Sequence, residues 1–251
     1  MNEGPVRLAV VILHYGEPSL ARGLHAQLAA ADPDLAAAGR LLVFDNAAPK
    51  AYDGAWQRST FNLYWAGALA HCAVAAHALG CTHLWFLNND IAFVSAPPFA
   101  ARVVARLARM ERAEAHPVGV YTPAVVRSPY HPQMIHRQGV QYSRVAITDG
   151  IAPVYSLACL NAIGGVDADD NPYGYGVETW LSLRAHRAGW PVVVDHHVVV
   201  QHRHHTTARK VEGFMELAAK AEQAYMTNRL GPHWRDAVTA FKEQCTDART
   251  L

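Results

Sequence analysis

The chain has 251 residues, of which 51% are hydrophobic and 17% are charged, and its formal net charge is +1. A chain of this length and composition can bury one large core, so we expect one domain with a terminal appendage. Because the net charge is close to zero, no overall field attracts nucleic acid, and nucleic-acid binding is excluded as a leading function.

The amino-terminal segment and the cysteines indicate the compartment. The apolar run that ends before His14 is much shorter than the ~20 residues that span a membrane, and no cleavage region typical of a signal peptide follows it. The four cysteines lack CxxC spacing and lie mostly in apolar patterns, at Cys72, Cys81, Cys159 and Cys245. This pattern favours buried thiols over a disulfide or zinc framework. We therefore expect a cytoplasmic protein without a transmembrane segment.

The first ninety residues alternate predicted strands and helices. Apolar runs predict strands at 7–14, 40–44 and 83–87. Two helices are predicted between them, one with Leu20, Leu24 and Leu28 on its packed face and one with Leu69, Cys72, Ala76 and Leu79, which ends at Gly80. Parallel neighbouring strands require crossover helices on the faces of the sheet, so this order predicts a mostly parallel, doubly wound, Rossmann-like α/β sheet.

Each of these three strands ends in polar residues, namely His14 and Tyr15, Asp45 and Asn46, and Asn88, Asn89 and Asp90. Right-handed crossovers place the three strand ends on one rim of the sheet, where open α/β sheets bind their ligands. Asp90 is a candidate ligand for a divalent cation that also contacts a diphosphate. The alternative is that such residues only cap turns by bonding to their own backbone.

The remaining chain is predicted to be less regular. A helix at 99–115 packs Val103, Leu107 and Met110, while Arg102, Arg106 and Arg109 are predicted to form a solvated face. Short β-rich pieces separated by turn residues follow at 118–157. The further predicted elements are a short helix at 156–163, a loop at 164–176, a helix at 177–189, two strand-like pieces within 191–205, and two amphipathic helices at roughly 209–230 and 233–245.

Several motifs in order resemble one known family. They are VVILHYGEP, LLVFDNAAP, NLYWAGALAHCAVAAHALG, LWFLNND, and the stretch from IGGVD through YGYGVETWLSLRAHRAGW to VVVQH. This set is similar to the inverting family 2 glycosyltransferases, and the resemblance covers residues 6–205. It implies a GT-A fold with a domain at 1–205, divided into a nucleotide-binding half at about 1–94 and an acceptor-side half at about 95–205. A lid segment and helical appendage follow at 206–251.

The resemblance implies a hexosyltransferase-like reaction in which a sugar passes from a nucleotide-diphosphate sugar to a hydroxyl acceptor with inversion. Such a reaction requires a base for the acceptor hydroxyl and stabilisation of the departing diphosphate. Glu178 matches the position of the base, at a helix start whose dipole favours an ionised carboxylate. Val177 and Glu178 stand where the family usually has Glu-Asp, so the carboxylate lies roughly 1.5 Å further from the backbone. The alternative is a helix-capping acid.

The resemblance also implies a metal site in which Asp90 and His202 hold Mn²⁺ or Mg²⁺, with diphosphate oxygens and water completing the coordination. Asn88 and Asn89 replace one expected acid of the family's DxD motif, although an amide oxygen is also a competent ligand. The alternatives for His202 are a histidine without a ligand role and an independent zinc site among the neighbouring histidines.

The resemblance places the donor nucleotide at the first two strand ends. Asp45 accepts a hydrogen bond from the base, and the backbone near His14 and the ring of Tyr15 flank that base. Asn46 belongs to the same site or is only a turn residue. Asn62 and Gly67 lie at a loop-to-helix approach to the donor, or they cap the helix.

Acceptor recognition is predicted at Tyr173, Tyr175 and Trp180, because aromatic faces pack against the C–H face of sugars; Trp180 is alternatively a core residue. Segment 203–210 is basic and predicts a lid in which Arg203, Arg209 or Lys210 reaches the diphosphate. The expected acceptor is a saccharide or a glycolipid, in polysaccharide or glycolipid biosynthesis, with contact at the inner membrane face.

Two other functional classes stay open. A scaffold or binding protein that kept the fold and lost its acids agrees with the departures at Asn88 and Val177. A sugar nucleotidyltransferase would also bind a nucleotide at this rim, but LHYGEPSLARG lacks the glycine-rich, basic phosphate loop that it needs. For the C-terminal helices, contacts with a membrane, a partner or a second copy are open, and their mixed charge favours docking onto the domain.

Overall fold

The computed structural model describes residues 5–203, 211–248 and 251. Its strands are β1 (Leu8–His14), β2 (Leu41–Asp45), β3 (Gln57–Arg58), β4 (His83–Asn88), β5 (Ile91–Phe93), β6 (Val120–Val125), β7 (Tyr142–Val145), β8 (Val154–Ser156), β9 (Val192–His202) and β10 (Cys245–Ala248). Its α-helices are α1 (Pro18–Ala31), α2 (Pro33–Ala37), α3 (Tyr64–Ala78), α4 (Ala100–Glu114), α5 (Leu157–Ala162), α6 (Val177–Arg187), α7 (Phe214–Leu230) and α8 (Trp234–Glu243), with a 3₁₀ turn, η1, at Pro132–Met134.

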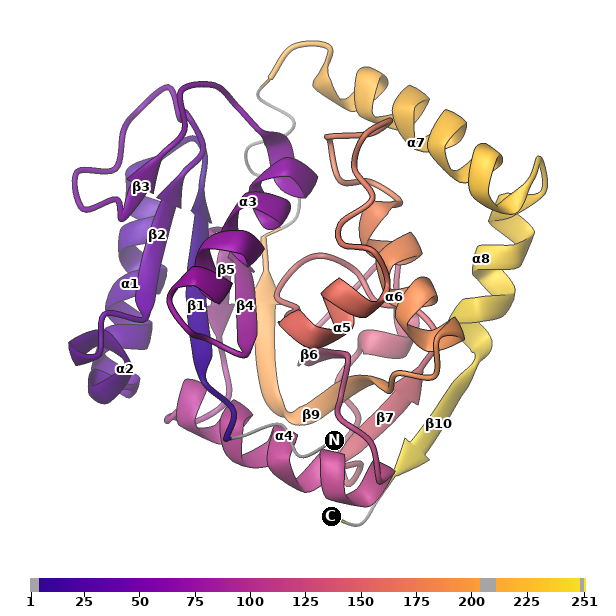
Figure 1. Cartoon of the computed structure of the whole chain (residues 1–251), viewed down its shortest axis with the longest axis horizontal. Coiled ribbons are helices and arrows are strands. Elements are labelled where there is room, and N and C mark those ends of the chain that lie inside the picture. Colours follow the sequence, from indigo (N-terminus) through magenta and orange to yellow (C-terminus); the bar gives the residue numbers. More distant parts are fainter. Residues whose placement is uncertain (1–4, 204–210, 249–250) are drawn as a thin grey trace.

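The amino-terminal half is the predicted parallel sheet. β1 is buried along its whole length and pairs in parallel with β2 on one side and β4 on the other. The register sets His14 opposite Asp45 and Leu13 opposite Asn88, so the polar ends of the three strands share one rim, as the sequence predicts. The helices α1 and α3 lie on opposite faces of this half (Figure 1), as right-handed crossovers in opposite directions require.

Beyond β4 the sheet is mixed. The strand order is β10-β7-β9-β6-β8-β4-β1-β2-β3, and β5 pairs with β9. The short strand β8 runs antiparallel to both β4 and β6, whereas β6 and β9 are parallel. The uninterrupted parallel run therefore extends from β3 to β4, and the pairing of β6 with β9 is a separate parallel pair. The reversal takes place between β6 and β7, which no α-helix separates: β7 runs antiparallel to β9, and β8 keeps the direction of β7.

The arginines of α4 do not form one solvated face. Arg106 is buried, and its Nε donates to Asp195 Oδ2 at 2.5 Å while its Nη2 donates to the backbone oxygen of Gln141 at 2.9 Å. The helical spacing explains the difference, because position 106 is three residues after Val103 and four before Met110 and so lies on their packed face. A buried carboxylate opposite makes that position tolerable for arginine.

The predicted pair of strand-like pieces near residue 195 is a single strand with an irregularity. The pairing of β9 with β6 passes from Pro123–Asp195 to Ala124–Val199, so three residues of β9 bulge out at that point. Proline has no N–H to give to the ladder, which favours a bulge opposite Pro123.

The two C-terminal helices are shorter than predicted. In the described residues α7 begins at Phe214 and α8 ends at Glu243, and Cys245–Ala248 then forms β10, which pairs antiparallel with β7. The two helices pack along one side of the molecule (Figure 1), in agreement with docking onto the domain. No helix in the described residues has both the length and the apolar character needed to cross a membrane.

Candidate functional site

At the end of β2, Asp45 is buried and shapes the loop that follows it. Its Oδ1 accepts from the backbone N–H of Ala48 at 2.8 Å, and its Oδ2 accepts from the N–H of Tyr52 and from Arg58 Nη1, both at 2.9 Å. Its two carboxylate oxygens therefore already accept three hydrogen bonds within the protein. The structure gives Asp45 the role of fixing residues 46–58 beside the rim.

His14 and Tyr15 lie beside this loop. The buried His14 ring shares a hydrogen bond with the Lys50 backbone oxygen, with 2.8 Å between Nε2 and O. The half-buried Tyr15 accepts a hydrogen bond at its backbone oxygen from Asn89 Nδ2 at 3.3 Å. The ends of β1 and β4 are thus tied together at the rim where the nucleotide was predicted.

Asn46 and Asn62 form one connected pair. Asn46 Nδ2 donates to Asn62 Oδ1 at 2.9 Å and to the Tyr64 backbone oxygen at 3.1 Å, while Asn46 Oδ1 accepts from the Leu63 N–H at 2.8 Å. These bonds fix the turn into α3. Gly67 lies in the first part of that helix, where a Cβ would come within 3.2 Å of the Leu63 Cβ. Asn46 and Asn62 thus act as turn residues, and contact of these residues and Gly67 with the donor stays a prediction.

The end of β4 brings Asp90 to His202. Ile91 of β5 pairs with His202 of β9, and the Arg203 N–H donates to the Asp90 backbone oxygen at 3.0 Å. The two side chains consequently meet, with 3.0 Å between His202 Nε2 and Asp90 Oδ1, and only 11% and 12% of their surfaces are exposed. The structure joins the two residues that the sequence predicts as metal ligands. Asn88 stands at the same edge and donates its N–H to the Ile151 backbone oxygen at 3.0 Å.

The donor set suits a hard divalent cation of the Mn²⁺ type. Carboxylate oxygen and imidazole nitrogen are both ligands of Mn²⁺, and two protein ligands leave positions for phosphate oxygens and water. In the described residues no group of three or more His, Cys, Asp or Glu side chains gathers as a metal site. The pair therefore fits a cation that is held jointly with a substrate.

Glu178 lies in the first turn of α6, directly after the glycine-rich loop. The pKa of its carboxyl is raised to about 8: burial is the largest cause, the charges of Glu222 and Asp149 act in the same direction, and hydrogen bonds from the backbone at Glu178 and Gly176 lower it. The start of the helix favours the ionised form, as expected, but desolvation outweighs this effect. A carboxyl with a pKa near neutral pH suits a general base.

Asp149 is a candidate site residue that the sequence analysis missed. It is buried in the loop after β7, its Oδ1 accepts the Ile151 N–H at 3.1 Å, and burial raises its pKa to about 6. It lies within Coulomb range of both Glu178 and His202. The available signal was an acid followed by glycine between two apolar pieces, a pattern that also describes an ordinary turn.

Tyr173 and Tyr175 belong to an aromatic cluster with Tyr64 and Phe214. Ring centroids lie 4.7 Å apart for Tyr64 and Tyr173, 5.7 Å for Tyr173 and Phe214, and 6.3 Å for Tyr175 and Phe214. Burial raises the pKa of the Tyr175 phenol to about 12, and the charges of Glu178 and Asp90 act in the same direction. Tyr175 is therefore near both acids of the predicted site.

Trp180 does not join this cluster. Its Nε1 donates to Asp167 Oδ2 at 3.1 Å, and its ring packs with the residues that fix α7 and α8. Two residues along a helix turn a side chain by about 200°, so Trp180 and Glu178 leave α6 on different sides. Trp180 is half-buried against the residues that fix α7 and α8, which favours the core alternative, and its part in acceptor recognition stays a prediction.

Trp65 connects the two halves of the molecule. Its Nε1 donates to the Gly150 backbone oxygen at 3.1 Å. A Cβ on Gly150 would lie 2.6 Å from the indole, and one on Gly174, whose φ is +106°, would lie 2.8 Å from the Trp65 Cβ. Two loops therefore approach the indole as closely as glycine allows.

The predicted lid residues are only partly described. Arg203 is exposed next to His202, and its backbone bond to Asp90 holds it at the edge of the site. Arg209 and Lys210 lie outside the described residues.

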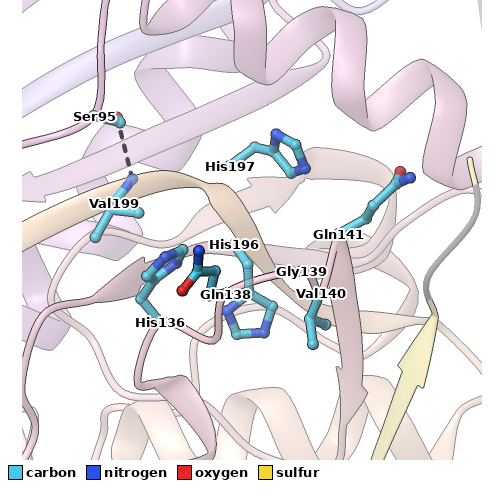
Figure 2. Close-up of a pocket in the computed structure, with 9 residues that line it drawn as sticks. All are labelled: Ser95, His136, Gln138, Gly139, Val140, Gln141, His196, His197 and Val199. Atoms are coloured by element: carbon cyan, nitrogen blue, oxygen red, sulfur yellow. Dashed lines mark hydrogen bonds between the residues drawn. The ribbon is translucent and has the colours of Figure 1, made fainter.

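A surface cavity of about 530 Å³ lies at the bulge of β9 rather than at the rim. Its lining, drawn in Figure 2, consists of Ser95, His136, Gln138, Gly139, Val140, Gln141, His196, His197 and Val199. It includes none of the predicted site residues. The Asp90–His202 pair at the rim and the acids Glu178 and Asp149, whose pKa values are raised, define the candidate functional site, and cavity size does not.

The fold is shared with glycosyltransferases of known structure. GalNAc-T7, solved with UDP, GalNAc and Mn²⁺, superposes with a TM-score of 0.59 at 12% identity over 80% of this chain and 44% of that protein. The mannosyltransferase PcManGT from Pyrobaculum calidifontis, in complex with GDP-Man and Mn²⁺, gives a TM-score of 0.57 at 14% identity over 94% of this chain and 75% of that one. At these identities the likeness defines the class of fold, which is GT-A-like.

No protein-family profile matches the chain. Its sequence is 32% identical over 152 residues to three proteins described as uncharacterized, Mb1552 of Mycobacterium bovis and MT1576 and Rv1525 of Mycobacterium tuberculosis. Each match covers 59% of this chain and 56% of the relative, so the chain spans about half the length of these relatives.

Proposed function

We propose that the protein transfers a sugar from a nucleoside-diphosphate sugar to a hydroxyl acceptor with inversion, in polysaccharide or glycolipid biosynthesis. The observation that carries this proposal is the convergence of two separate groups of residues. Tyr175 lies within Coulomb range of both Asp90 and Glu178, and Asp149 within range of both His202 and Glu178. These shared neighbours support the proposal that one bound molecule contacts the Asp90–His202 pair and the Glu178 carboxylate together.

The two ends of the site have complementary tasks. The rim formed by β1, β2 and β4 receives the nucleotide, with Asp90 and His202 as the residues that would hold Mn²⁺ or Mg²⁺. A cation at this position supplies positive charge against the diphosphate as the sugar departs. The likeness to structures that contain nucleotide or nucleotide-sugar together with Mn²⁺ supports a donor and a cation of these kinds.

Glu178 receives the proton of the acceptor hydroxyl. Direct attack of that oxygen on the anomeric carbon breaks the bond to the diphosphate and inverts the configuration. Only the ionised carboxylate can accept the proton, so the pKa of about 8 predicts a rate that rises with pH, is half-maximal near pH 8 and levels off above it. The cluster of Tyr64, Tyr173, Tyr175 and Phe214 provides aromatic faces for the acceptor.

The test is an assay of sugar transfer from a panel of nucleoside-diphosphate sugars in the presence of Mn²⁺. Turnover is measured as the amount of nucleoside diphosphate that is released. We expect Glu178→Gln to lower turnover about a hundredfold or more, because a positioned base contributes at least that much. Glu216→Gln removes the same charge from an exposed position of α7 and should leave turnover unchanged. Binding of donor and metal by a wild-type protein that turns over no donor would instead favour a non-catalytic scaffold.

A further inference from the structure

The helix α7 carries an acid on the face that packs against the molecule. Its buried residues are Ala218, Tyr225 and Met226, and Glu222 lies four residues before Met226 and four after Ala218, on the same face. The other acid of this helix, Glu216, is exposed. A carboxylate on a packed helix face is costly unless a cation compensates it.

Gly176 brings this acid close to the catalytic turn. This glycine is the N-cap of α6, with φ +81°, and a Cβ there would lie 2.9 Å from Met226 Cγ and 3.3 Å from Glu222 Cγ. The stem of Glu222 thus packs against the residue that precedes the first turn of α6, and Glu178 is the second residue of that turn. Gly176 lacks the side chain that would separate the two acids.

The groups that face the two acids come from several elements. Burial raises the pKa of Glu222, and the positive charges of Arg235 and Lys242 of α8 lower it by a smaller amount. Arg235 itself donates a hydrogen bond to Gln223, the neighbour of Glu222. Around Glu178, Asp149 adds negative charge from the loop after β7, and the phenols of Tyr155, Tyr175 and Tyr225 lie within its field.

We propose that Glu222 is a positioning residue that acts through Glu178, holding the base in its protonated form until the pH or a ligand favours ionisation. This inference rests on the proposed function, in which Glu178 is the base. The role of Glu222 is electrostatic and geometric, because its stem lies against Gly176 and no transfer of a proton to substrate is assigned to it. The packing of α7 thereby sets the pH range in which the site can work.

A titration of the Glu178 side-chain carboxyl by carbon NMR tests this directly, with Glu178→Gln identifying the resonance. We expect a lower titration midpoint in Glu222→Gln than in the wild type. Glu222→Met keeps the packed volume next to Met226 and should show the same change if the charge is responsible. Each unit by which the midpoint falls raises the ionised fraction at lower pH about tenfold, and the pH–rate profile should move by the same interval.

Glu216→Gln is the matched control, since it removes one negative charge from the exposed side of the same helix. An unchanged midpoint in Glu222→Gln overturns the proposal, and so does an equal shift in all three variants, which would reflect net charge alone. The NMR titration needs no turnover. A wild-type protein that transfers no sugar would therefore contradict the proposed function, while the titration would still decide whether Glu222 controls the protonation of Glu178.

Discussion

Asp90 and His202 are 112 positions apart in the chain, yet their side chains form one pair because β5 and β9 are hydrogen-bonded neighbours. The sequence predicts both residues through family resemblance, and the strand register explains how they meet. Asp149 shows the limit of the approach. An acid in a turn gains its significance from the loop that buries it near Glu178, and spacing along the chain does not reveal that burial.

At the residue scale we expect Asp90→Asn and His202→Gln each to weaken Mn²⁺ binding about tenfold or more, because even the loss of a partner that only orients a ligand costs about 10–100-fold in metal affinity. The measurement is calorimetric titration of Mn²⁺ in the presence of a nucleoside diphosphate. Asp169→Asn, on the exposed part of the loop before α6, is the matched control. Unaltered Mn²⁺ affinity in both site variants would contradict the assignment of these two residues as ligands.

At the scale of elements, the helix α7 is fastened to the loop that leads into α6. Arg229 makes a two-pronged contact with Asp167, at 2.9 Å from Nε to Oδ2 and 2.6 Å from Nη2 to Oδ1. Tyr225 adds a hydrogen bond of 2.7 Å from its hydroxyl to the Asp167 backbone oxygen. The hydrogen bonds from Arg229 hold the pKa of Asp167 below its usual value. Asp167, the acid of the IGGVD motif, thus joins α7 to the loop before α6 without itself being one of the predicted site residues.

We expect Arg229→Met to lower the free energy of unfolding by about 1–3 kcal/mol, because it leaves a partly buried carboxylate without its charged partner. Lys220→Met, on the exposed side of the same helix, should change it by less than about 0.5 kcal/mol. Urea denaturation gives both values. Faster hydrogen exchange along α7 in Arg229→Met would show that the loss of stability is local to this helix. Equal unfolding free energies in the two variants would contradict a stabilising role of the contact between Arg229 and Asp167.

The sequence predicts well those elements in which the spacing of apolar residues and the residues that begin or end the element indicate the same secondary structure. The helix α4 has such a pattern, although buried Arg106 is visible only once Asp195 is known to face it. The strand β10 could not be predicted, since CTDA has no apolar alternation and is ordered by pairing with β7. Long-range pairing, rather than local preference, decides such segments.

At the scale of the whole molecule, buried titratable groups set the pH range of stability. Burial lowers the pKa of His83 and His196 to about 4 and that of His131 to about 3. Below pH 6.5 the unfolded chain binds protons that these folded histidines do not, so stability is lost as pH falls from 6.5 towards 4. The carboxyls of Glu178 and Asp149 act in the opposite direction, because their pKa values are raised.

We therefore expect maximal stability between about pH 6 and 7. Above this range the folded protein holds the Glu178 proton up to a pKa of about 8, so stability falls as pH rises towards 8 and then levels off. Glu178→Gln should remove this alkaline loss, on the order of 2 kcal/mol after allowance for the accessible part of the side chain. Denaturant unfolding at pH 5, 6.5 and 8.5 measures the curve, and a wild type that gains stability from pH 6.5 to 8.5 would contradict it.

The contact of Trp65 with Gly150 and Gly174 restricts which sequences can adopt this architecture. A larger residue in place of either glycine requires the Trp65 indole to move away or to be replaced by a smaller side chain. A smaller side chain at position 65 alone leaves a void between the helix α3 and the loop before α6. The three positions are consequently expected to change as a set during divergence. Replacement of all three together, rather than of one at a time, is the route by which an engineered or natural variant could change the spacing between the two halves of the site.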